Sequence, residues 1–204
     1  MSKSSLSTFV EFKLKHVKPY NHNTAKYVFE LYNGQASLLP IASCVVDDEL
    51  KQGEKLTIKG SIMMILYKIN EHDQVGMIVG STGITPMYQV LECALKDPSN
   101  KTKFALIFAN ISQHDILLHE EFDALKKAHP STFNAIYTLD QPGSNWKGYK
   151  RFVNREVIKQ NIASTTLGDK VKVFICVYGQ MVEDDGGMKK GACMYNSLCS
   201  YIYM

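Results

Sequence analysis

Arginine is scarce in this chain. Its 204 residues include only two, Arg151 and Arg155, and both lie in the last third. The other basic side chains are lysines spread along the chain, and the formal net charge is only +3. The nearest approaches to a cationic cluster are the pairs Lys126–Lys127 and Lys189–Lys190. Because isolated lysine pairs are typical of solvated faces, the sequence does not favour nucleic-acid binding.

Paired cysteines are also lacking. The chain has five cysteines, an odd number, and they are Cys44, Cys93, Cys176, Cys193 and Cys199. No two of them form a C-x-x-C pair, which argues against both a disulfide framework and a zinc site. Histidines do not supply a metal site either, since His114 and His119 are five residues apart rather than three or four. We therefore expect no metal and a reducing, cytoplasmic setting.

Long hydrophobic runs are missing as well. Apolar runs such as Ile62–Tyr67 are far too short to cross a bilayer, so we expect no transmembrane segment. The first residues carry serine and lysine without an apolar stretch, so we expect no signal peptide. Association with the cytosolic face of a membrane stays open.

The first part of the chain alternates apolar and polar residues, the pattern of half-buried strands. It predicts strands within Phe9–Leu14 and Tyr27–Leu31 around a polar turn at Tyr20–Thr24. An apolar stretch, Leu38–Val46, and a short strand within Gly53–Gly60 follow. These segments predict part of an antiparallel β-barrel, which we assign to a first domain, residues 1–72.

From Val75 onward, strands alternate with helices. The pattern predicts strands at Gly76–Val79, Lys103–Asn110, Phe133–Leu139 and Lys170–Tyr178. It predicts helices at Thr85–Lys96, Asp115–His129 and Arg155–Ile162. Such alternation is typical of a parallel sheet whose ligands bind beyond the carboxyl ends of the strands. The predicted fold class is therefore α/β, with a nucleotide-binding domain over residues 73–204 preceded by the partial antiparallel barrel.

The segment Val75–Pro86 reads V-G-M-I-V-G-S-T-G-I-T-P, in which an apolar strand ends in a glycine turn before a helix. We expect Thr85 to cap this helix and Pro86 to occupy its first position. A turn of this kind aims backbone N–H groups and the positive end of a helix at an anion, which favours a phosphate-binding loop. The spacing is not G-x-G-x-x-G, and an ordinary strand–helix turn is the alternative.

Several motifs occur in an order that resembles a known family. They are G-S-T-G-I-T-P-M from Gly80, Phe108-Ala-Asn110, Asp115-Ile-Leu-Leu118, Tyr137-Thr-Leu-Asp140 and Phe152-Val-Asn154. This series resembles the NADH–cytochrome b5 reductases, a group of ferredoxin-reductase-like flavoproteins. The resemblance is close from about Val75 to Ile162 and weaker over Phe9–Ile41.

The resemblance implies a site. Its cofactor-binding positions are Gly80, Ser81, Thr82, Gly83, Ile84, Thr85, Pro86, Asn110 and Asp115. In the family, the glycine loop binds the NADH phosphates. The threonine that matches Thr82 approaches the flavin, and the cysteine that matches Cys176 lies near the nicotinamide. The resemblance therefore implies Thr82 and Cys176 as the catalytic residues. Asp115 matches a position that contacts the adenine ribose, where a carboxylate repels a 2′-phosphate. The alternatives are a buried structural cysteine at Cys176 and a dipole-stabilised helix start at Asp115.

The chain also departs from the family. Ser81 stands where the family has a second glycine, and serine fits there only if the position does not need a positive φ. The family's C-G-P-P-x-M is Cys176-Val-Tyr-Gly-Gln-Met181 here. The FAD motif R-x-Y-[ST] cannot exist, because no arginine precedes Arg151. Near Val46–Asp47 the chain omits a large middle part of the family's flavin barrel, which leaves a remnant of the FAD domain.

These features lead to one expected function and two alternatives. The first is an oxidoreductase that moves electrons from NADH through FAD to a heme protein such as cytochrome b5. The second is a truncated relative that binds the nucleotide without an FAD site or redox activity. The third is a product of an altered reading frame or splice at the Val46–Asp47 join.

Overall fold

The computed structural model describes residues 9–21, 24–30, 53, 55–59, 67–162 and 165–176. Contacts within the chain divide it into two compact units, Met1–Leu66 and Tyr67–Met204. The apolar stretch Leu38–Val46, the join near Val46–Asp47 and everything after Cys176 lie outside the described residues.

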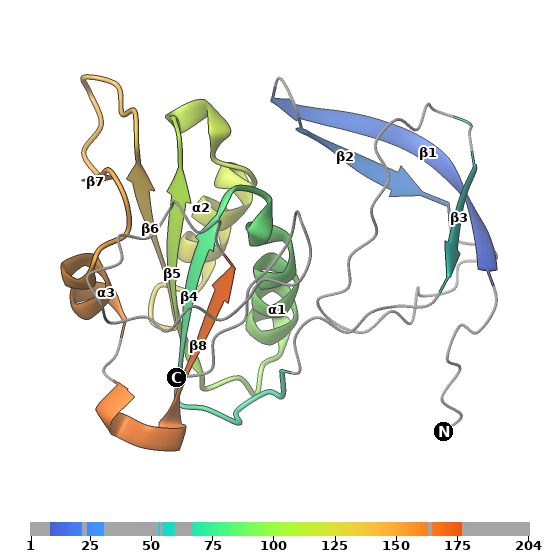
Figure 1. Cartoon of the computed structure of the whole chain (residues 1–204). Coiled ribbons are helices and arrows are strands. Elements are labelled where there is room, and N and C mark those ends of the chain that lie inside the picture. Colours follow the sequence, from blue (N-terminus) through green and yellow to red (C-terminus); the bar gives the residue numbers. More distant parts are fainter. Residues whose placement is uncertain are drawn as a thin grey trace. The chain divides into compact units, whose positions relative to one another are not determined.

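The first unit contains a three-stranded antiparallel sheet in the order β2-β1-β3 (Figure 1). Its strands are β1 (Phe9–Asn21), β2 (Thr24–Phe29) and β3 (Lys55–Lys59). The first half of β1 pairs with β3, and the second half pairs with β2. Leu14, only 1% exposed, lies where β1 changes partner. The two predicted strands and the strand within Gly53–Gly60 are confirmed. The predicted turn at Tyr20–Thr24 is too long, because β1 continues to Asn21 and β2 begins at Thr24.

The second unit contains a five-stranded parallel sheet in the order β7-β6-β5-β4-β8. The strands are β4 (Gln74–Gly80), β5 (Lys103–Asn110), β6 (Phe133–Leu139), β7 (Tyr149–Lys150) and β8 (Val171–Cys176). The helices are α1 (Ile84–Lys96), α2 (His119–Ala128) and α3 (Arg155–Asn161). Short 3-10 turns occupy Ser81–Gly83 (η2), Gln113–Asp115 (η3) and Thr165–Lys170 (η4).

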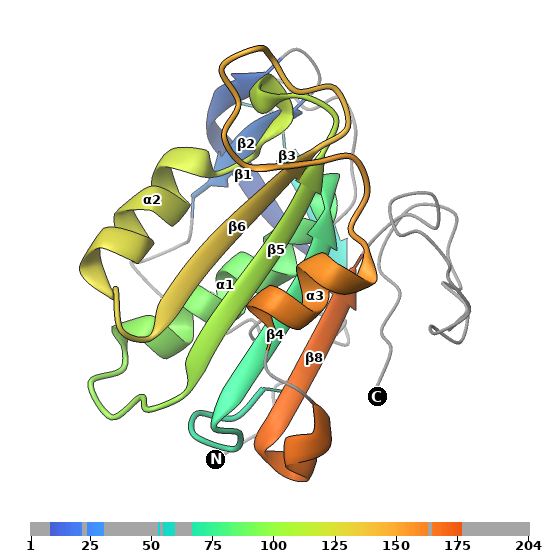
Figure 2. The same ribbon diagram turned by 90° about the vertical axis from the view of Figure 1, so that its left-hand side faces the viewer.

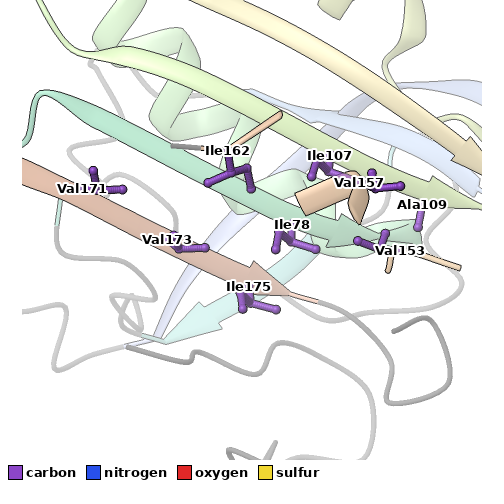
Figure 3. Packing of buried hydrophobic residues seen from close by; sticks show 9 residues of the cluster. All are labelled: Ile78, Ile107, Ala109, Val153, Val157, Ile162, Val171, Val173 and Ile175. Atoms are coloured by element: carbon purple, nitrogen blue, oxygen red, sulfur yellow. The ribbon is translucent and has the colours of Figure 1, made fainter. Parts of the chain in front are cut away.

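Helices cover both faces of this sheet: α1 and α2 lie on one side and α3 lies on the other (Figures 1 and 2). Burial of the apolar stripe of α1 is what holds that helix on the sheet. The five residues predicted for the stripe are all buried, and they are Met87, Val90, Leu91, Ala94 and Leu95. On the opposite face, Val157 and Ile162 pack with Ile78, Ile107 and Ile175 of the strands (Figure 3). The predicted α/β fold with a parallel sheet is confirmed.

One helix boundary is wrong in the sequence-based prediction. Helix α2 begins at His119 rather than at Asp115. Two local features explain the delay. Asp115 closes a separate 3-10 turn with Ser112, and Leu118 adopts a left-handed conformation with φ 56°, which interrupts helical propagation. The two-residue strand β7 was not predicted, because so short a segment has no detectable period.

The start of α1 also differs from the prediction. The N-cap of α1 is Gly83, and Pro86 is the third helical residue rather than the first. The Thr85 hydroxyl does not cap the helix; it donates a hydrogen bond to the Thr82 carbonyl at 3.1 Å. Proline is tolerated there because the first-turn N–H groups have no partner within the helix.

The side-chain hydroxyl of Tyr137 is buried without a hydrogen-bond partner among the described residues. The Tyr137 ring packs edge-on against His119 with centroids 4.9 Å apart, and it also meets Phe108. Burial raises the pKa of this phenol, with a further contribution from Asp123. The hydroxyl therefore stays protonated and unpaired.

Replacing Tyr137 with Phe is expected to raise the free energy of unfolding by roughly 1 kcal/mol, because it removes a buried hydroxyl that has lost water. The matched control is Tyr149→Phe. The Tyr149 hydroxyl donates to Gln160 at 2.9 Å and accepts from Asn161 at 3.1 Å, so its loss should lower stability. Urea unfolding of both variants measures the difference. A loss of stability in Tyr137→Phe would contradict the assignment.

Candidate nucleotide-binding site

The carboxyl ends of the central strands meet where the direction of the sheet's connections changes. Strand β4 has β5 on one side and β8 on the other. Helix α1, which follows β4, and helix α3, which precedes β8 in the chain, lie on opposite faces of the sheet (Figures 1 and 2). In open α/β sheets, ligands bind in the crevice at such a switch point. The expected glycine loop, which follows β4, is located there.

The loop itself is the 3-10 turn Ser81–Gly83, which leads directly into α1. The first turn of α1 contains no acidic residue, so its positive end is not neutralised by a side chain. The Ser81 and Thr82 side chains are partly exposed. Ile84 and Pro86 are buried, whereas Thr85 is exposed. A hydroxyl-bearing turn in front of a 13-residue helix suits an anion.

Ser81 has a φ of 50°, in the left-handed region. The condition under which serine was expected to fit, a position without positive φ, is therefore not met. A non-glycine residue in this region costs about 1–2 kcal/mol. The chain thus retains the turn that the glycine loop requires, at the expense of local strain. Gly80, in contrast, is extended, with φ −131°.

Gly83 and Cys176 are in very close approach. A Cβ atom added to Gly83 would lie 2.6 Å from the Cys176 carbonyl oxygen and 2.7 Å from its Sγ. Cys176 ends β8, pairs in register with Val79 of β4, and is 2% exposed. Only glycine can bring the loop this close to the end of β8. The structure therefore brings together the glycine loop and the implied catalytic cysteine, with the thiol packed beneath the loop.

Asn110, the last residue of β5, has an unusual environment. It is 5% exposed, and neither its Nδ2 nor its Oδ1 has a hydrogen-bond partner among the described residues. Leaving a buried amide unpaired costs about 1–3 kcal/mol for each group. Its neighbour Ala109 pairs in register with Gly80, so Asn110 lies at the same sheet edge as the loop. Unsatisfied polar groups at such an edge are a common feature of ligand sites.

Asp115 lies one loop further along this edge, in the 3-10 turn after β5. Its Oδ2 accepts hydrogen bonds from the Ser112 backbone N–H at 3.0 Å and from the Ser112 hydroxyl at 2.6 Å. The carboxylate thus closes a capping box rather than starting α2. A second acid, Asp140, follows β6 and is exposed. The sequence analysis included Asp140 as the last residue of the motif Tyr137-Thr-Leu-Asp140, but it assigned this residue no role in the site.

Apolar side chains also reach the surface at this edge. Ile111 after β5 is 52% exposed, and Phe152 after β7 is 38% exposed.

In the part of the chain that the structure describes, the histidines, cysteines and acids form no group that could hold a metal. None of its helices has the length and apolar character needed to cross a bilayer.

Gly83→Ala is expected to lower the free energy of unfolding by about 1–3 kcal/mol, because the new methyl group would overlap the Cys176 backbone. The control is Gly143→Ala, since nothing lies within 4 Å of a Cβ at that exposed position. Thermal or urea unfolding of the two variants compares them. Equal stability of both would show that the loop and β8 are not in contact.

Comparison with known proteins identifies the family. A family model described as "Oxidoreductase NAD-binding domain" matches residues 77–185. A protein named NADH-cytochrome b5 reductase 2 from Mycosarcoma maydis is 36% identical, over 89% of this chain and 65% of the relative. One of the same name from Yarrowia lipolytica is 35% identical, over 82% of this chain and 72% of the relative. The chain spans less than two thirds of several such relatives, for example 61% of that from Botryotinia fuckeliana.

Solved structures agree on the fold. The cytochrome b5 reductase domain of Ulva prolifera nitrate reductase has a TM-score of 0.77 and 22% identity, over 86% of this chain and 89% of that one. The CS-b5R domains of human Ncb5or have a TM-score of 0.66 and 17% identity, over 82% and 62%. At such identities the likeness shows the fold alone. Taken with the family model and the relatives, the motifs at the sheet edge show that this chain belongs to the NADH–cytochrome b5 reductase family of ferredoxin-reductase-like proteins.

Proposed function

We propose that this chain binds NADH at the carboxyl edge of its parallel sheet and works as an NADH-dependent flavoprotein oxidoreductase of the cytochrome b5 reductase type. The observation that carries the proposal is the contact between Gly83 and Cys176 at the switch point of the sheet. It supports a pyrophosphate on the loop and a nicotinamide near the end of β8.

The residues of the chain fit such a nucleotide. The loop offers the hydroxyls of Ser81 and Thr82, and α1 adds a positive end without a competing acid. The unpaired amide of Asn110 would gain partners if a ligand or its bound water reached it. With the pyrophosphate over the loop, one half of NADH extends toward β8 and Cys176. The adenosine half then extends toward β5 and β6, where Asp115 and Asp140 lie.

The chemistry would be divided between cofactors and protein. FAD, when bound, would supply the acceptor for the NADH hydride and release electrons one at a time. The protein would align NADH through the loop, with Thr82 toward the flavin, while the thiol of Cys176 packs against the loop. The final acceptor in this proposal is a heme protein such as cytochrome b5, after which the relatives are named.

The lack of arginine in the first part of the chain favours a second candidate function, nucleotide binding without flavin. The whole of Met1–Leu66 contains no arginine, so the family's guanidinium grip on the FAD pyrophosphate has no equivalent there. The alignment with the Mycosarcoma maydis protein extends over 228 positions, more than the chain itself contains, so that relative has residues inside the matched region that this chain lacks. These observations support a protein that binds NADH without flavin or turnover.

Purified full-length chain is expected to bind NADH, seen as a change in nicotinamide fluorescence on titration. Gly83→Ala should weaken this binding by about tenfold or more, because the loop must move away from β8. Gly143→Ala should leave the binding unchanged. An absorbance scan for flavin and an assay of NADH–ferricyanide turnover then separate the two functions. A flavin band with turnover supports the reductase, and bound NADH with neither supports the second candidate. Absence of NADH binding would refute both.

A contact between the Asp115 carboxylate and the ribose of NADH can be tested separately from the structural role of Asp115 in the turn. Ser112→Ala and Asp115→Ala both break the capping box, and each should lower stability by about 1 kcal/mol. Only Asp115→Ala removes the carboxylate. If this carboxylate contacts the ribose, NADH affinity should fall about tenfold in Asp115→Ala and stay within about twofold in Ser112→Ala. Equal effects of the two substitutions would limit Asp115 to a structural role.

A further inference from the structure

The hairpin of β1 and β2 carries charge of one sign only. Residues 12–29 contain four lysines and no acid. The lysines are Lys13, Lys15, Lys18 and Lys26, and all of them are exposed. Because these residues are not consecutive in the chain, the sequence shows no basic run. The pairing of the two strands is what brings the charges together.

Two of these lysines face each other across the hairpin. Lys18 of β1 is directly opposite Lys26 of β2, and His16 precedes Lys18 by two residues on the same face. Residues directly opposite in an antiparallel pair have Cβ atoms about 5 Å apart, so like charges there repel each other. The register shift between Leu14 and His16 adds Lys15 as one further exposed base. The hairpin thus maintains a repulsive arrangement.

The other half of β1 is different, because acids compensate its lysines. Lys13 is directly opposite Lys55 of β3, but the Lys55 Nζ lies 2.8 Å from the Glu11 Oε2. The Glu30 N–H donates to the Lys13 carbonyl at 2.9 Å, which brings a second acid beside this half of the strand. Positive charge is therefore concentrated where β1 pairs with β2.

An aromatic side chain also reaches the surface on this hairpin. Tyr27, next to Lys26 in the chain and opposite Val17, is 36% exposed. Strand β2 lies at the edge of the described sheet (Figure 1). An edge strand presents the side chains of both its faces to a surface that it approaches, so Lys26 and Tyr27 can contact the same surface. Tyrosine is enriched at membrane–water interfaces, where its ring is apolar and its hydroxyl is hydrated.

We propose that the β1–β2 hairpin docks with its β2 edge on an anionic phospholipid surface. Lys18 and Lys26 contact the lipid phosphates, and Tyr27 lies at the level of the headgroups. Lysine suits such a surface, because it carries a compact charge on a flexible stem, whereas a single defined phosphate is better matched by arginine. Residues 1–66 contain no arginine.

The size of the hairpin favours a membrane over a protein partner. Strand β2 has six residues. At roughly 3.4 Å per residue it is about 20 Å long, and two strands are about 10 Å wide. The resulting surface, on the order of 200 Å², is well below the roughly 800 Å² that each partner contributes to a stable protein interface. Lysine on an edge strand also prevents pairing with other chains. That role does not require Lys15 and Lys18 on the central strand β1.

Lipid vesicles of two compositions test the proposal with the full chain. One set contains phosphatidylcholine alone, and the other contains about one third phosphatidylserine. In a flotation assay at low ionic strength, the chain is expected to float with the anionic vesicles and not with the neutral ones. Salt at about 0.5 M should release it, because exposed charges are then screened.

Variants of the hairpin locate the contact. Lys18→Gln combined with Lys26→Gln should weaken binding to the anionic vesicles by about tenfold or more, because each lysine near such a surface contributes about fivefold. The double variant removes a repulsive pair, so the hairpin should still fold, which a circular dichroism melt checks. Tyr27→Thr should weaken binding by about threefold. The matched control, Lys101→Gln with Lys127→Gln, removes the same charge from exposed positions of the second unit and should stay within about twofold.

Four results would overturn the proposal. They are an absence of binding to the anionic vesicles, equal binding to both kinds of vesicle, and an equal loss in the two double variants, which would indicate attraction by the net charge of the chain. The fourth is binding to soluble polyglutamate without binding to vesicles, which would indicate an acidic protein partner. The hairpin variants should leave NADH affinity unchanged, so the proposed function stands or falls separately.

Discussion

The close approach of Gly83 to the end of β8 is the contact on which the site depends. It joins segments more than ninety residues apart in sequence, because Gly83 is the N-cap of α1 and Cys176 ends β8. Any side chain at position 83 would separate them. The glycine therefore fixes the distance between the loop and the end of the last strand. The strained φ of Ser81 is tolerated within this same turn.

Features that repeat along the sequence could be predicted well. The apolar stripe of α1 has a helical period, and all five of its predicted residues are buried. Strands β5 and β6 have the predicted bounds, because continuous apolar runs between polar turns are clear strand signals. The glycine turn between a strand and a helix also lies in the predicted place, because the three elements follow one another directly in the sequence.

Features set by single side chains could not be predicted. Asp115 forms a capping box with Ser112 instead of beginning α2. The sequence alone is equally compatible with a capping box and with a helix start at this aspartate. Positive φ values at Ser81, Leu118 and Arg151 result from the surrounding packing, and no local pattern marks them for these residue types. The buried, unpaired amide of Asn110 is likewise visible only once burial and hydrogen bonds are known. The candidate site was thus predictable in its position and much less so in its chemistry.

The order of the strands has a consequence for biosynthesis. In the sheet, β4 pairs with β8, yet Gln74 and its partner Val171 are 97 positions apart in the chain. While the chain is being made, β4 can acquire α1 and β5 early, but its other edge stays open until β8 has left the ribosome. An open, apolar strand edge can pair with other chains, and such long-range parallel pairing forms slowly. The nascent protein is therefore most exposed to misassembly, and has most need of a chaperone, in the interval before β8 closes that edge.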